Sequence, residues 1–120
     1  MQIDFGGLII LEGQMVKGFI DGILLSILSE RESYGYDMMK TVQERTDRQL
    51  EIKEGTLYPA LRRLEAEGFI VGKWATHEQG ARRRYYHITQ NGKNELQRMK
   101  ASWSKNYRII NTFLKEDYSL

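Results

Sequence analysis

The sequence contains no cysteine and a single proline, Pro59. The missing cysteines exclude disulfides, thiolate chemistry and zinc ribbons, and they fit the reducing cytoplasm where we expect the protein to reside. No run of about 18 apolar residues occurs, so no membrane-spanning helix is predicted. The apolar stretch at residues 8–11 lacks a basic leader and is interrupted by Glu12, so we do not expect a signal peptide.

A large excess of charge of one sign is also missing. The 18 basic and 16 acidic residues leave a net charge of only +2. Any binding of nucleic acid must therefore come from the placement of charges and not from bulk basicity. The 120 residues are enough for one domain that buries roughly two-thirds of its unfolded surface, with room for an appended helix.

Apolar periodicity predicts two helices in the first half of the chain. Residues 1–14 hold several glycines without a clean period, and we interpret them as an N-terminal arm or a short helical turn. From Met15 onward, apolar residues recur at spacings of three and four. Ser33 is predicted to cap a second helix that runs to about residue 47. Residues 50–52 alternate and predict a short strand.

The second half predicts a third helix, a hairpin and a long final helix. The third helix begins near Glu54, buries a leucine face and ends at Gly68. Residues 69–76 and 82–88 have the aromatic and β-branched content of paired strands. Thr89 is predicted to cap the last helix. The order predicts a mainly α fold with a small β-hairpin: an arm (1–14), a winged helix-turn-helix (15–88) and a C-terminal dimerisation helix (89–120).

The third helix carries the residues best suited to grip a duplex. The free amides at its start attract phosphate, Lys53 adds charge, and Thr56 and Tyr58 add hydroxyl groups. Pro59 lies in the first turns, where a backbone can approach phosphate closely. Arg62 projects outward one turn later, as base readout in a major groove requires. The plainer alternative is a solvated helix whose arginines pair with neighbouring glutamates.

Three consecutive arginines open the return strand of the hairpin. Alternation places Arg83 on the face opposite Arg82 and Arg84. A solvated strand edge is one interpretation, and a wing that reaches a minor groove or flanking phosphates is the other. The two histidines match no metal-ligand spacing, so we expect no metal.

The final helix carries an apolar seam that we expect a second copy of the chain to cover, because the preceding domain already has a core. The seam comprises Leu96, Met99, Trp103, Ile110 and Phe113. Trp103 has two interpretations: packing within a dimer core, or a platform where two indoles sandwich a planar aromatic ligand. Met15 and Met99 would then give a deformable lining.

The string EGTLYPALRRLE at residues 54–65, followed by residues 68–70, 80–86 and 88–89, resembles the PadR family of transcriptional regulators. Tyr34–Tyr36 also looks like that family's motif, and the similarity runs from about Val16 to Phe113. The resemblance implies a compact member: a winged-helix repressor, without cofactor or enzymatic activity, that binds a two-fold symmetric operator as a homodimer. The DNA contacts that it implies are Tyr36, Lys40, Lys53, Thr56, Tyr58, Pro59, Arg62, Arg82 and Arg83.

Residues 101–104 and 109–110 further resemble the multidrug-sensing members of that family. This implies a site for flat aromatic compounds at the dimer centre, beside Trp103. Tyr107 departs from the pattern, because an acid that helps bind cationic drugs is expected there, and Asp21 or Glu95 could substitute for it. The ligand-binding set is Met15, Asp21, Met99, Trp103 and Tyr107.

Two other classes of function compete with this hypothesis. Many winged helices are protein-interaction modules that never touch DNA, and fold alone does not decide between the two. An enzyme is not expected, because no nucleophile, acid–base pair or phosphate loop stands at a meaningful spacing.

Overall fold

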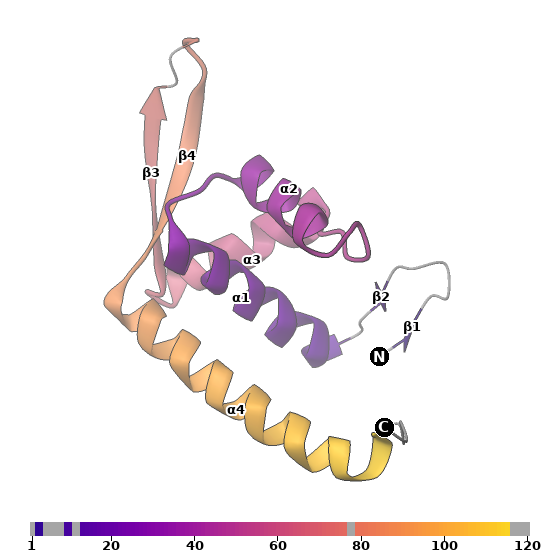
Figure 1. Cartoon of the computed structure of the whole chain (residues 1–120). Coiled ribbons are helices and arrows are strands. Elements are labelled where there is room, and N and C mark those ends of the chain that lie inside the picture. The colour runs from indigo at the N-terminus through magenta and orange to yellow at the C-terminus, as the bar shows by residue number, and fades with distance from the viewer. Residues whose placement is uncertain (1, 4–8, 11–12, 77–78, 116–120) are drawn as a thin grey trace.

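The computed structural model describes residues 2–3, 9–10, 13–76 and 79–115. The described part is mainly α with one long antiparallel hairpin, as predicted (Figure 1). None of its helices is long and apolar enough to cross a membrane. The elements in chain order are β1 (Gln2–Ile3), β2 (Ile9–Ile10), α1 (Gly13–Glu30), α2 (Gly35–Arg45), α3 (Glu54–Ala66), β3 (Ile70–Thr76), β4 (Arg82–Ile88) and α4 (Gln90–Leu114).

The core lies where α1, α2 and α3 meet the base of the hairpin. Leu24 and Leu25 from α1 are fully buried, together with Met38 from α2 and Leu57 and Leu61 from α3. The predicted stripe on α1 is therefore confirmed as the inner face of that helix. In Figure 1 the hairpin rises from one side of this bundle, and α4 runs along the opposite side of α1.

Two local predictions were wrong, and one open alternative is decided. Of the two interpretations of residues 1–14, the short helical turn does not hold for the described residues, because Gln2 pairs antiparallel with Ile10. Helix α2 begins at Gly35 and is not capped by Ser33, because the Ser33 hydroxyl donates a hydrogen bond of 2.6 Å to the Asp37 carboxylate. Residues 50–52 form no strand; Ile52 is buried as part of the connection between α2 and α3.

The start of α4 is fixed to the start of the hairpin. The Thr89 hydroxyl accepts a hydrogen bond from the Gly92 amide at 3.0 Å, which confirms the predicted cap, and it donates to the Gly68 carbonyl at 2.6 Å. Gly92 packs so closely on the Phe69 carbonyl that a β-carbon there would collide with it. The direction of α4 is thereby set by the junction between α3 and β3.

The hairpin, called the wing below, pairs in register from Ile70 opposite Ile88 to Thr76 opposite Arg82. Its base is joined to the link between α1 and α2 by two backbone hydrogen bonds between Ser33 and Tyr86, of 3.3 and 2.8 Å. Within the described residues, the outer half of the wing extends beyond the helical bundle (Figure 1).

Candidate nucleic-acid interface

Helix α3 is amphipathic in the sense that the sequence predicted. Leu57, Leu61 and Leu64 are fully buried against α1 and α2. The opposite face is exposed, so its polar side chains are available to an external partner. The predicted DNA contacts on this face and just before it are Lys53, Thr56, Tyr58, Pro59 and Arg62, and all are exposed.

Neighbouring arginines on α3 have different environments. Arg63 turns toward α1 and forms an ion pair with Asp21, whose side chain is only 8% exposed. Arg62 is exposed and has no ion pair or hydrogen bond within the described part of the chain. The plainer interpretation, in which both arginines pair with neighbouring glutamates, is therefore wrong. Arg63 pairs with Asp21 on another helix, and Arg62 faces solvent.

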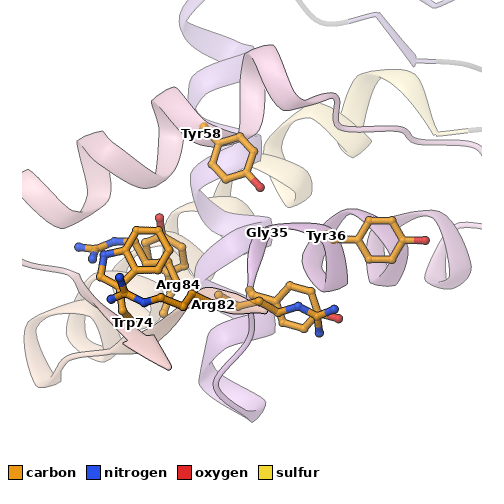
Figure 2. Close-up of a pocket in the computed structure, with 9 residues that line it drawn as sticks. Gly35, Tyr36, Tyr58, Trp74, Arg82 and Arg84 are labelled. Atoms are coloured by element: carbon orange, nitrogen blue, oxygen red, sulfur yellow. The ribbon is translucent and has the colours of Figure 1, made fainter. Parts of the chain in front are cut away.

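A cleft of about 610 Å³ opens between the start of α2, α3 and the wing. Figure 2 shows Tyr58 reaching from α3 toward Gly35, and Tyr36 projecting from α2. A β-carbon at Gly35 would collide with the Tyr58 hydroxyl, so this approach depends on glycine. The lining is aromatic and basic: Tyr34, Gly35, Tyr36, Tyr58, Trp74, Arg82, Arg83, Arg84 and Tyr86.

Each wing arginine lies over an aromatic ring. Arg82 lies 5.2 Å from the centre of the Trp74 ring, and Arg83 lies 4.5 Å from that of Tyr34. Arg84 lies 5.8 Å from both Trp74 and Tyr86. Stacking of this kind orients a guanidinium while leaving its N–H groups able to donate. The sequence placed Arg83 on the face opposite Arg82, but gave no sign of the aromatic partners.

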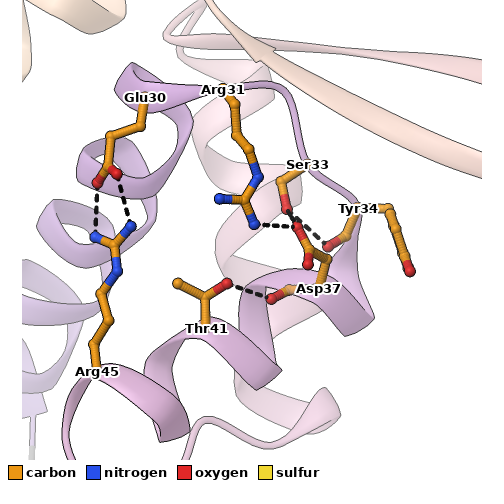
Figure 3. A network of polar contacts seen from close by, with 7 residues as sticks. All are labelled: Glu30, Arg31, Ser33, Tyr34, Asp37, Thr41 and Arg45. Atoms are coloured by element: carbon orange, nitrogen blue, oxygen red, sulfur yellow. Dashed lines mark hydrogen bonds and ion pairs between the residues drawn. The ribbon is translucent and has the colours of Figure 1, made fainter.

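The predicted contacts on α2 lie beside this cleft. Tyr36 is 65% exposed, and Lys40 is exposed one turn later. The start of α2 is held by Asp37, which accepts hydrogen bonds from Ser33 and, at 2.8 Å, from Arg31 (Figure 3). Burial acts to raise the pKa of Asp37, but these two donors outweigh it and the pKa is lowered.

A second polar contact fixes the other end of α2. Arg45 donates two hydrogen bonds to the Glu30 carboxylate on α1, at 2.6 and 2.7 Å (Figure 3). The hydrogen bonds from Arg45 lower the pKa of Glu30. Helix α2 is thus held at its start by the link that follows α1 and at its end by the last residue of α1, and these contacts help to position Tyr36 and Lys40.

The apolar seam of α4 divides into two parts. Leu96 is 4% exposed within the single chain and belongs to its core, so little of its side chain remains for the predicted interface. Met99 packs partly against the same core, with its sulfur 3.7 Å from the β-position of Gly22. Beyond it, Trp103, Ile110 and Phe113 are exposed by 55%, 53% and 79%.

The predicted ligand residues are only partly gathered around Trp103. Tyr107 is a neighbour, with ring centres 6.3 Å apart. Phe19 of α1, which the sequence did not single out, packs edge-on against Trp103 at 5.4 Å. Asp21 is buried against Arg63 and offers no open carboxylate there. Met15 lies on α1, but its side chain is outside the described residues.

The remaining acid considered for that site is also occupied. Glu95 accepts hydrogen bonds from Arg98, which lowers the pKa of Glu95.

No cluster of three metal-ligating side chains occurs among the described residues. His87 lies 3.2 Å from a carboxylate oxygen of Glu32.

A basic wing beside the exposed face of α3 agrees with what sequence comparison finds. The family model for PadR-like transcriptional regulators matches residues 24–98. The chain belongs to this family. Members of the PadR-like family are transcription regulators and not enzymes, and the winged helix of this chain is of the DNA-binding type.

Solved structures of transcriptional regulators match the fold over most of this chain. A transcriptional regulator from Clostridium thermocellum is 38% identical, with a TM-score of 0.78, over 86% of this chain and all of that one. A PadR family transcription regulator from Clostridium difficile is 37% identical, with a TM-score of 0.72, over 80% and 98%. The negative transcriptional regulator PadR of Bacillus subtilis is 27% identical over 81% of this chain and 51% of its own length.

Proposed function

We propose that this PadR-like protein is a homodimeric repressor that binds a two-fold symmetric DNA operator. The observation that carries the proposal is the contrast between the two arginines of α3. Arg63 is paired inside the fold, whereas Arg62 is exposed and unpaired within the described residues, on the helix whose Tyr58 lines the basic and aromatic cleft. An arginine held out in this way can donate two hydrogen bonds to a guanine edge in the major groove.

The residues around Arg62 provide contacts to DNA phosphates that do not depend on the base sequence. Lys53 and Thr56 lie at the start of α3, where free amides and the helix dipole attract phosphate. Lys40 and Tyr36 extend this surface along α2, and Arg83 extends it along the wing. Contacts of this class fix the register of a protein on a duplex, while base contacts carry specificity.

The exposed half of α4 supports the homodimer. Trp103, Ile110 and Phe113 expose more than half of their surface in the single chain, and monomers rarely leave such a row of apolar side chains in water. A second copy related by a two-fold axis would cover them. The two α3 helices would then enter successive major grooves, about 34 Å apart.

Repression and its relief are the finer parts of the proposal. The Bacillus subtilis relative is a negative regulator, which supports repression here. Exposed Trp103, flanked by Phe19 and Tyr107, offers an aromatic wall for a flat ligand at the dimer centre. Such a ligand would release DNA only if it binds the released arrangement of the dimer more tightly.

The test measures binding of the protein to the duplex upstream of its own gene and to a random duplex, by fluorescence anisotropy over a range of salt. We expect a preference for the upstream duplex and a log–log salt slope that reports the number of phosphate contacts. Arg62→Ala should reduce the preference, and Arg83→Ala should reduce the slope by about one. Arg98→Ala on α4 is the matched control. Equal affinity for both duplexes at every salt concentration would leave the protein-interaction module as the better description.

A further inference from the structure

One carboxylate joins the recognition helix to the wing. Glu65 lies on α3, one turn after Arg62, and its Oε2 atom accepts two hydrogen bonds from the wing. The Gly72 amide of β3 donates at 3.1 Å, and the Arg84 guanidinium of β4 donates at 2.7 Å. Both strands of the wing are thus attached to a single side chain of α3, which we call the Glu65–Arg84 bridge.

The bridge depends on Gly72 of β3, which pairs with Tyr86 on the neighbouring strand, two residues from Arg84. A β-carbon at Gly72 would lie 2.5 Å from Nε of Arg84, so any larger residue would displace the guanidinium. Glycine weakens a strand interior and commonly marks a close approach of another group. Here the approaching group is the Arg84 side chain, which crosses β3 to reach Glu65.

Aromatic rings hold the same guanidinium in place. The Arg84 guanidinium lies 5.8 Å from the ring centres of both Trp74 and Tyr86, and Tyr86 is buried. Figure 2 shows Arg84 and Trp74 together at the cleft. The three consecutive arginines therefore differ: Arg84 is engaged with α3, while Arg82 and Arg83 make no ion pair within the described residues.

We propose that Glu65 is a positioning residue for DNA binding: the Glu65–Arg84 bridge sets the angle of the wing relative to α3. A two-stranded hairpin has little rigidity of its own, and its outer half extends beyond the bundle. The bridge fixes where Arg82 and Arg83 lie when Arg62 is in the major groove. This inference rests on the proposed DNA-binding function, because it describes how two parts of that surface are aligned.

The proposal predicts an effect of opposite sign to simple electrostatics. Removing a negative charge near a DNA-binding surface should strengthen binding to the anionic duplex. Glu67→Gln, two residues further along the chain and exposed, should behave in this way. Glu65→Gln removes the same charge but weakens the bridge, and we expect it to bind the upstream duplex more weakly than the parent does and about tenfold more weakly than Glu67→Gln does.

A double-mutant cycle separates positioning from general loss of structure. If the bridge acts by placing the wing, Arg83→Ala should cost much less affinity in the Glu65→Gln background than in the parent. A structural defect remote from the wing would leave the two costs equal. Circular dichroism and the urea midpoint should show that the Glu65→Gln fold is retained.

A second variant tests the bridge without any change of charge. Gly72→Ala displaces the Arg84 guanidinium and should reproduce the loss of affinity, whereas Gly18→Ala, in open space on α1, should not. If Glu65→Gln fails to fold, the affinity of Gly72→Ala alone tests whether the Glu65–Arg84 bridge contributes to DNA binding. Binding by Glu65→Gln and Gly72→Ala as tight as that of their controls overturns the bridge alone. A parent protein that does not bind the duplex overturns the proposed function as well.

Discussion

The Asp21 carboxylate on α1 forms an ion pair with the Arg63 guanidinium on α3, and it is almost fully buried. The contact ties the recognition helix to the helix that also packs on α4 through Gly22 and Phe19. It removes Asp21 from the candidate ligand site and Arg63 from the candidate DNA surface. Two adjacent arginines on one helix thus have different environments, one paired within the fold and one exposed.

Substituting these arginines should separate stability from DNA binding. Arg63→Gln leaves the buried Asp21 carboxylate without its partner, and we expect the free energy of unfolding to fall by about 2–4 kcal/mol. Arg62→Gln should change it by less than about 0.5 kcal/mol, because the side chain is exposed. Urea unfolding at one fixed protein concentration measures both. Affinity for the upstream duplex should show the reverse order, and equal stability of the two variants would contradict this assignment.

Charge placed on the outer half of α4 should dissociate the proposed dimer without unfolding the chain. Phe113 is 79% exposed in the single chain, so Phe113→Asp should yield a folded monomer by sedimentation equilibrium. Ala101→Asp adds the same charge on the other side of α4 from Trp103 and should leave the proposed dimer intact. A Phe113→Asp protein that remains dimeric would place the interface elsewhere.

Leu96→Ala should instead lower the free energy of unfolding by about 2–4 kcal/mol, because it opens a cavity in the core.

Flat aromatic dyes should quench tryptophan fluorescence chiefly through Trp103. The chain has two tryptophans, and the other, Trp74, lies on the wing. We expect Trp103→Ala to abolish most of the dye-dependent quenching, whereas Trp74→Phe should retain it. Phe19→Ala should weaken dye binding, because its ring packs edge-on against the Trp103 indole. Equal quenching in the parent and in Trp103→Ala would remove Trp103 from any ligand site.

Acid should release the stabilisation provided by Asp37. Its pKa in the folded chain is lowered below the ordinary value of 3.8, because the Ser33 and Arg31 donors outweigh burial. A depressed folded-state pKa stabilises the fold at pH values above 3.8, and this contribution is lost as the pH falls through the folded-state pKa. Asp37→Asn should therefore lower stability at neutral pH and flatten the loss in acid. Urea midpoints from pH 7 down to about pH 2 test this, and parallel profiles would contradict it.

Local signals predicted the helices and the hairpin well. Apolar periodicity gave the inner faces of α1 and α3, and the Thr89 cap and Gly68 marked where helices begin and end. The prediction failed at Ser33, because its hydroxyl and its backbone have partners in Asp37 and Tyr86 that a capping rule does not consider. The burial of Leu96 within the chain's own core was not foreseen, because an apolar seam in one helix does not show which packing surface covers each position.

The sequence by itself determined the order of the four helices and the wing, the exposed polar face of α3 and the family, since all of these follow from short-range patterns of residue type. The tertiary structure alone decided which charges remain available. Arg63 pairs with a residue 42 positions away, and Arg84 with one 19 positions away, so neither choice follows from spacing along a helix or strand. A guanidinium pairs with a carboxylate that tertiary packing places within hydrogen-bond distance, and only the folded chain brings Asp21 to Arg63 and Glu65 to Arg84.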